Sequence, residues 1–135
     1  MRLGEAKIVR TGSHVTVVAS QLMLHRSLEA AALAAEGIEV EVIDVRSFVP
    51  LDKASILTSL AETNRLVVVE EAPHQAGWGG DIASLAADEG VYWLTAPVRR
   101  VNMGGALIAY SPPLEDEVLP NVGRITRAIR SVLAE

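Results

Sequence analysis

The chain has 135 residues, half of them hydrophobic and only 4% aromatic, with no cysteine and a formal net charge of −5. This length is that of a single domain, and the lack of cysteine excludes disulfides and thiolate metal sites. The acidic balance argues against a nucleic-acid partner, and no apolar run approaches the length of a membrane-spanning helix. We therefore expect one cytoplasmic domain over residues 1–135.

The first third of the chain alternates between strand and helix patterns. Residues 15–19 are rich in β-branched side chains, which predicts a buried strand, and residues 5–10 are a candidate edge strand. Helical spacing then runs from Ser20, a suitable N-cap, to Glu36, with Gly37 placed as the C-cap. Residues 39–45 predict the next strand, and the polar–apolar alternation at its start predicts one less buried face.

The middle of the chain repeats the alternation. Asp52 is placed to cap a helix that ends at Asn64. Residues 65–70 hold four consecutive apolar positions, the pattern of a strand covered on both faces. A glycine-rich loop, residues 77–80, then leads to a helix predicted from Asp81.

The last third predicts a fourth core strand over residues 97–101, a long irregular stretch, and a final helix after Pro120. The proline pair at 112–113 favours a stiff, extended backbone within the irregular stretch. Strands that alternate with helices imply right-handed crossovers. The fold class is therefore α/β, with three layers: a mostly parallel open sheet and helices on both of its faces.

The glycine-rich loop is a candidate anion site, because glycines ahead of a helix can expose backbone N–H groups. Its spacing matches neither a dinucleotide fingerprint nor a P-loop. Asp81 would occupy the helix start, and Glu70 and Glu71 would repel a phosphate. A structural turn is the favoured interpretation of this loop.

Three histidines are candidates for acid–base chemistry, because imidazole titrates near neutral pH. His14 lies in a predicted turn and is expected to be solvated, and His25 lies in the first turn of a predicted helix. His74 follows a strand end, where ligands bind in open α/β sheets. The three lack metal-ligand spacing and a nucleophilic partner, so we assign no catalytic, cofactor-binding or metal-binding residue.

An acidic run is a candidate partner-binding site. Glu115, Asp116 and Glu117 follow the proline pair, and consecutive carboxylates suit a basic partner surface. A solvated loop is the competing interpretation. Among the few aromatic residues, Tyr92, Trp93 and Trp78 are candidate interface anchors, and Trp78 is expected to be the most exposed.

Several segments together resemble the C-terminal domain of the β subunit of 2-oxo acid dehydrogenases that use thiamine diphosphate. These segments occur in the same order as in that family: residues 15–19 (VTVVA), 23–31 (MLHRSLEAA), 42–52 (VIDVRSFVPLD), 71–73 (EAP), 77–80 (GWGG), 96–101 (APVRRV) and 110–115 (YSPPLE). The resemblance covers residues 4–133. One departure is residues 103–109 (MGGALIA), where the family commonly carries an aspartate and prolines.

This resemblance implies a transketolase C-terminal-like domain that pairs β subunits and docks the peripheral subunit-binding domain of an acyltransferase. Thiamine diphosphate and magnesium would bind in other domains of an assembly with α subunits, so the chain would be enzymatic only as part of that whole. The pairing implies a homodimer. The missing preceding domain implies either a fragment or a split-gene product.

Two alternatives stay open at this point. In the first, the chain is the C-terminal domain of another thiamine enzyme, such as a transketolase or a deoxyxylulose-phosphate synthase. In the second, it is a free-standing module that binds a small anion through residues 77–81. The identity of the 2-oxo acid lies outside what the sequence determines.

Overall fold

A five-stranded sheet forms the centre of the protein in the computed structural model, which describes residues 1–34 and 37–135. The strands lie in the order β1-β3-β2-β4-β5. Their bounds are β1 Lys7–Arg10, β2 Val15–Ala19, β3 Val40–Asp44, β4 Leu66–Val69 and β5 Arg99–Val101. All neighbours are parallel except β1, which pairs antiparallel with β3 at the edge.

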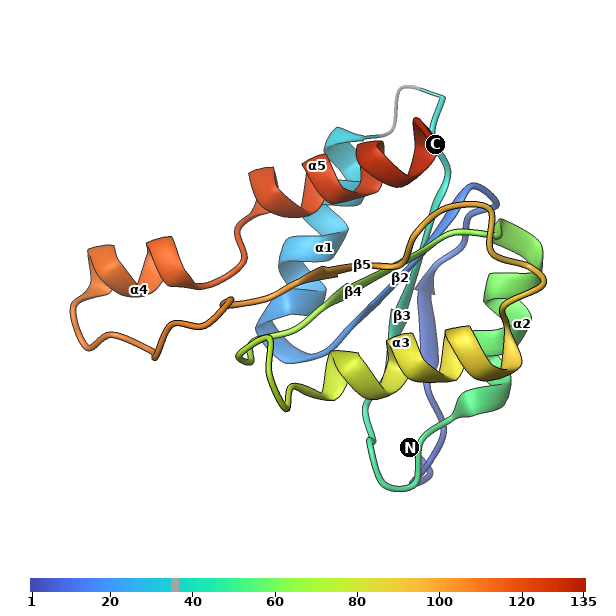
Figure 1. The fold of residues 1–135 in the computed structure, drawn as a ribbon, viewed down its shortest axis with the longest axis horizontal. Helices are drawn as coiled ribbons and strands as arrows, with labels where there is room; N and C mark the ends of the chain where they lie inside the picture. The colour runs from blue at the N-terminus through green and yellow to red at the C-terminus, as the bar shows by residue number, and fades with distance from the viewer. Residues whose placement is uncertain (35–36) are drawn as a thin grey trace.

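Five helices accompany the sheet within the described residues. They are α1 Gln21–Leu33, α2 Lys53–Thr63, α3 Trp78–Glu89, α4 Pro112–Val118 and α5 Val122–Leu133. Helices α1 and α5 cover one face and α2 and α3 cover the other, while α4 lies apart from the sheet (Figure 1). The predicted three-layer α/β architecture is therefore confirmed. None of the helices in these ranges is long and apolar enough to cross a membrane.

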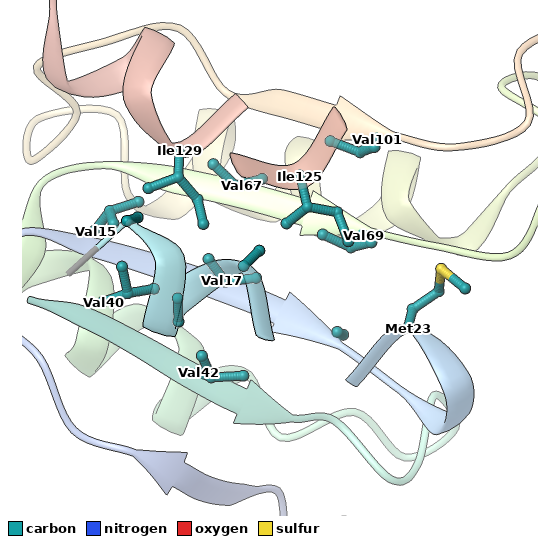
Figure 2. Close-up of a cluster of buried hydrophobic side chains, with 14 of the residues drawn as sticks. Val15, Val17, Met23, Val40, Val42, Val67, Val69, Val101, Ile125 and Ile129 are labelled. Carbon is teal, nitrogen blue, oxygen red and sulfur yellow. The ribbon is translucent and has the colours of Figure 1, made fainter. Parts of the chain in front are cut away.

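Two apolar clusters form the core, one on each face of the sheet, because successive strand residues point to opposite faces. Val15, Val17, Val67 and Val69 meet Ile125 and Ile129 on the α1/α5 face (Figure 2). The intervening strand residues, such as Val18, Ile43 and Val68, face Ile56 and Leu60 of α2. Every residue of β2 and β4 is buried, which explains their continuous apolar runs.

Most of the predicted boundaries agree with the structure. Asp52 caps α2 by accepting a hydrogen bond from the backbone N–H of Ser55, and Asn64 ends the helix in the left-handed conformation with a φ of 63°. Residues 7–10 form the expected edge strand. The strand predicted over residues 97–101 is shorter than expected and lies at the edge of the sheet, not in its middle.

Four local predictions were wrong. Ala34, not Gly37, caps the end of α1, and the predicted last residues of that helix lie outside the described residues. Glu41 of β3 is 6% exposed, because the face predicted to be less buried carries α2. Helix α3 begins at Trp78 and takes Gly79 and Gly80 into its first turn. The proline pair begins helix α4 instead of an extended segment, since proline at the first helical positions costs no hydrogen bond.

Candidate interaction site at the carboxyl edge of the sheet

The carboxylate of Glu70 is the centre of a buried polar cluster at the carboxyl ends of β4 and β5. The Glu70 side chain is fully buried. Its Oε1 accepts hydrogen bonds from Arg100 Nη2 at 2.6 Å, Arg100 Nε at 3.2 Å and Asn102 Nδ2 at 3.2 Å. Its Oε2 accepts the backbone N–H of Gly79 at 2.6 Å. One side chain therefore ties the strand ends to the first turn of α3.

This cluster explains the glycine-rich loop. A Cβ atom at Gly77 would lie 2.6 Å from Glu70 Oε2, and one at Gly79 would lie 2.6 Å from Glu70 Oε1. Such distances are far below van der Waals contact, so both glycines permit the close approach of the carboxylate. The N-terminus of α3, where an external anion was considered, holds the protein's own carboxylate. The interpretation of a structural turn is the one that this geometry supports.

The three histidines lie apart from one another. The Nδ1 atom of His74 lies 3.1 Å from Asn102 Nδ2, beside the polar cluster, and the residue is exposed. His25 is exposed on α1, beside a shallow depression that Arg46 and Phe48 also line. His14 is half-buried, and its Nδ1 accepts the backbone N–H of Glu39 at 2.8 Å, so the expected solvated ring is engaged within the protein. Over residues 1–34 and 37–135 no group of three His, Asp or Glu residues is placed to hold a metal ion.

The predicted acidic run lies on a segment that leaves the body of the domain. No residue from 104 to 118 is buried, whereas Met103 and Leu119 at its two ends are. We call residues 104–118 the arm; it contains α4 and extends away from the sheet beyond α1 and α5 (Figure 1). Asp116 and Glu117 are exposed on α4, and Glu115 is half-buried. The arm carries no lysine, arginine or histidine.

The arm also exposes large apolar side chains. Leu107 is 85% exposed, Tyr110 is fully exposed, and Ile108 and Leu114 are more than half exposed. Several large apolar side chains exposed within one short segment are typical of a site of contact with other molecules. The acidic run directly follows the last of these apolar residues, so the arm presents both kinds of group on one excursion of the chain.

Both ends of the arm are held by polar contacts. At its start, the N–H of Gly104 donates to Asn102 Oδ1 at 2.9 Å, and the N–H of His74 donates to the Gly104 carbonyl at 2.7 Å. Arg124 of α5 donates to the Asn102 carbonyl at 2.6 Å and, more weakly, to the Val118 carbonyl at 3.4 Å. The same Asn102 contacts Glu70, so the buried cluster and the base of the arm form one network.

Trp78, the other predicted partner residue, does not lie with the acidic run. It is half-buried in the first turn of α3, and its ring packs on Phe48 with a centroid separation of 4.7 Å. The prediction that Trp78 is the most exposed of the three aromatic residues was wrong, because Tyr92 is 98% exposed and Trp93 is 39% exposed. A tryptophan beside glycines reads as exposed in the sequence, but helix α3 starts early and brings the ring onto the body of the domain.

Sequence reasoning missed the buried Glu70 and the apolar part of the arm. Glu70 had one available signal: a carboxylate directly after an apolar strand, followed by glycines at 77 and 79. The apolar arm had another, because Leu107, Ile108 and Leu114 lie in the stretch that was predicted to be irregular, where no helix or strand was expected to bury them. Neither signal shows by itself whether a side chain is buried, because burial depends on contacts with residues that are distant in the sequence.

Comparison with known proteins places this geometry in a family. Residues 4–125 match the model of the transketolase C-terminal domain. The chain belongs to this family. The β subunit of the acetoin:2,6-dichlorophenolindophenol oxidoreductase of Bacillus subtilis (strain 168) is 42% identical over 134 residues, which are 98% of this chain and 39% of that protein. The β subunit of the pyruvate dehydrogenase E1 component of Rickettsia conorii (strain ATCC VR-613 / Malish 7) is 39% identical over 130 residues, which are 96% of this chain and 40% of that protein.

A solved structure agrees with the fold. A split-gene transketolase, described as an inactive β4 tetramer, has a TM-score of 0.84 and 27% sequence identity, and the match covers 99% of this chain and 43% of that one. The resemblance inferred from the sequence motifs is thereby confirmed. The chain spans about two fifths of the length of the curated relatives that it matches.

Proposed function

We propose that this transketolase C-terminal domain belongs to the β subunit of a thiamine-diphosphate-dependent 2-oxo acid dehydrogenase, acting in the cytoplasm. It serves β-subunit pairing and the docking of partner proteins, and it is enzymatic only within the whole assembly. The observation that carries this proposal is the arm, because exposed apolar and acidic side chains on a chain excursion suit contact with other proteins. The names of the relatives at about 40% identity, all β subunits, support it.

The partners that we propose are a second β subunit, an α subunit and the peripheral subunit-binding domain of the acyltransferase. Glu115, Asp116 and Glu117 are the proposed partner-binding residues. Trp78 is also a proposed partner-binding residue, but only part of its ring is available for contact, because the ring packs on Phe48.

The cofactor of the whole enzyme, thiamine diphosphate with magnesium, would supply the decarboxylation chemistry from outside this chain. The residues of the polar cluster do not fit such a group. The Glu70 carboxylate already accepts four hydrogen bonds from within the domain, and no side chain set suited to a metal surrounds it in the described ranges. We therefore assign no catalytic or cofactor-binding role to these residues and derive no reaction step through the cofactor.

A transketolase or deoxyxylulose-phosphate synthase remains the second candidate, on the strength of the structural match to a split-gene transketolase. The higher identity to dehydrogenase β subunits favours the first candidate. Complementation with the remaining transketolase domains separates the two, since only the second predicts activity that depends on a phosphosugar. The third candidate, an anion-binding module, is disfavoured because Glu70 occupies the N-terminus of α3.

A calorimetric titration of an acyltransferase subunit-binding domain into this chain tests the proposal, with the mass followed by light scattering. We expect a dimer that binds one subunit-binding domain per pair. Substitution of Glu115, Asp116 and Glu117 by their amides should weaken this binding. The control that removes charge elsewhere is Asp88→Asn/Glu89→Gln, because these exposed carboxylates lie on α3, away from the arm. A monomer that releases no heat would contradict both the pairing and the docking roles.

A further inference from the structure

The carboxylate of Glu41 is buried with almost no partner. Glu41 of β3 is only 6% exposed. Its Oε2 accepts one long hydrogen bond, from the N–H of Gly12 at 3.4 Å, and among the residues that the structure describes no donor or cation contacts its Oε1. Buried carboxylates are normally paired with a cation or with several donors, as Glu70 is. Glu41 therefore lacks the positively charged partner that a buried carboxylate requires.

Glu41 lines a groove between β1 and α2. The groove has a volume of about 280 Å³. Three hydroxyls and a second carboxylate line it from one face of α2, at helical spacing: Ser55, Thr58, Ser59 and Glu62. The described residues around the groove include no lysine, arginine or histidine, and Glu62 is exposed. The groove is therefore negatively charged, and it gives a cation a path to Glu41.

The Ser59 hydroxyl ends a buried chain of hydrogen bonds that uses its proton. Thr63 Oγ1 donates to the Arg65 carbonyl at 3.2 Å, which takes the one proton of that hydroxyl. The contact of 2.7 Å between Thr63 Oγ1 and Thr16 Oγ1 then takes the proton of Thr16. The contact of 2.6 Å between Thr16 Oγ1 and Ser59 Oγ takes the proton of Ser59. Ser59 Oγ is left with lone pairs, so toward the groove it can only accept.

The Ser55 hydroxyl is in the same state. Its Oγ donates its proton to Asp52 Oδ2 at 2.7 Å and keeps its lone pairs. The groove thus combines acceptor oxygens of Ser55 and Ser59 with the carboxylate of Glu41. A primary ammonium group matches this set, because it carries a positive charge and three N–H donors and has no acceptor.

The shape of the groove favours an organic ammonium ion over a metal ion. In the ranges that the structure describes, no group of three His, Asp or Glu residues is placed to hold a metal. The groove is also far larger than a bare ion. Ile8 of β1 is 47% exposed, and Ala54 of α2 is exposed beside it, so the walls offer apolar surface for an alkyl stem.

We propose that the groove between β1 and α2 binds a small organic cation that carries a primary ammonium group on an alkyl stem. The ammonium group pairs with Glu41 and donates to the hydroxyl oxygens of Ser55 and Ser59. The stem lies against Ile8, and Glu62 adds attraction from the exposed side of the groove. This site is separate from the arm and does not depend on the subunit contacts proposed above.

A titration of the ¹⁵N-labelled chain with n-butylammonium chloride, followed by NMR, tests the proposal. The amide signals of Glu41, Ser59 and their neighbours should shift saturably. Half-saturation is expected on the order of 1 mM, because a ligand of five non-hydrogen atoms has a limited binding energy. n-Butanol, which lacks the charge, and sodium chloride at equal concentration should produce no saturable shift of these signals.

Substitution of the carboxylate separates binding from stability. Glu41→Gln keeps the size of the side chain and should bind n-butylammonium at least tenfold more weakly. Its midpoint of urea denaturation should equal or exceed that of the wild type, because an unpaired buried charge is removed. Glu29→Gln is the matched control, since Glu29 is exposed on α1 at the other face of the sheet, and its affinity should stay within twofold of the wild type.

Several outcomes would overturn the proposal. They are the lack of a saturable shift with the wild type, an affinity of Glu41→Gln equal to that of the wild type, and equal saturation by n-butanol. Saturation of the same signals by potassium chloride would make the occupant a metal ion and would also overturn it. If Glu41→Gln does not fold, Glu62→Gln decides, because Glu62 is exposed: about threefold weaker binding supports the site, and unchanged affinity refutes it.

Discussion

Glu70 Oε2 lies 2.6 Å from the backbone nitrogen of Gly79, and this contact places a buried carboxylate at the first turn of helix α3. The positive end of the helix dipole and the guanidinium of Arg100 both face that carboxylate, which offsets the cost of burying its charge. The loop between β4 and α3 therefore folds around Glu70.

Substitution of Gly79 by alanine should destabilise the domain by about 2 kcal/mol, the cost typical of overpacking a tight site. The added Cβ would lie 2.6 Å from Glu70 Oε1, and the carboxylate is fully buried and held by hydrogen bonds from Arg100, Asn102 and the N–H of Gly79. Urea denaturation measures the change. Gly80→Ala is the control, because its Cβ meets nothing nearer than Arg100 at 3.7 Å; equal losses for both variants would contradict the explanation.

Removal of the arginine that faces Glu70 should have a much larger effect than removal of its neighbour. Arg100→Met leaves a buried carboxylate without its charged partner, and we expect a loss of about 3 kcal/mol. Arg99→Met breaks a pair with Glu135 in which both side chains are 44% exposed, so the expected loss is below about 1 kcal/mol. Thermal and urea denaturation measure the loss of stability in each variant. Similar losses for the two would argue that Glu70 is not buried.

Asp52 predicts a specific dependence of stability on pH. Burial raises the pKa of its carboxyl, but hydrogen bonds from the N–H of Ala6 and from the side chain and N–H of Ser55 hold that pKa below its ordinary value of 3.8. The group is therefore more easily ionised in the folded state than in the unfolded state. Its stabilisation is complete above the unfolded pKa and is lost as the pH falls through the lower folded pKa.

Asp52→Asn tests this dependence, because an asparagine side chain still caps the helix but does not titrate. The variant should be less stable than the wild type at neutral pH, and the difference should shrink as the pH falls below about 4. Urea denaturation midpoints of the wild type and the variant, measured between pH 2 and pH 7, would show how this difference changes with pH. A difference that stays constant over this range would count against the role of the carboxylate charge.

The Trp78 side chain should contribute to the stability of the fold, in addition to any contact that it makes with a partner. Its ring packs on Phe48 and beside the α2/α3 core cluster, so Trp78→Ala should cost about 2 kcal/mol, roughly half the cost of emptying a fully buried aromatic site. Tyr92→Ala should leave the free energy of unfolding unchanged, since that side chain is 98% exposed. An unchanged stability for Trp78→Ala would contradict the contribution of its packing on Phe48.

Local sequence signals predicted the strands with continuous apolar runs and the helix with clear capping residues. Residues 15–19 and 65–70 read as strands because both of their faces meet helices, and Asp52 and Asn64 bounded α2 because their capping chemistry is local. Helix α4 was missed because Pro112 and Pro113 favour an extended backbone by themselves but are equally suited to the first turn of a helix. The exposure of Trp78 was misjudged for the related reason that helix α3 starts three residues earlier than the sequence predicted, at Trp78 instead of Asp81.

By itself the sequence determined the α/β class, the order of the main elements and the family, because periodicity, capping and motif order are properties of neighbouring residues. Only the tertiary structure decided that Glu70 is buried, that Gly77 and Gly79 make room for it, and that residues 104–118 leave the body of the domain. Glu70 reaches its partners Arg100 and Asn102 across thirty or more residues of chain, a distance over which no local pattern carries information. Exposure depends in the same way on which elements pack together, so the apolar exposure of the arm became recognisable only in the folded molecule.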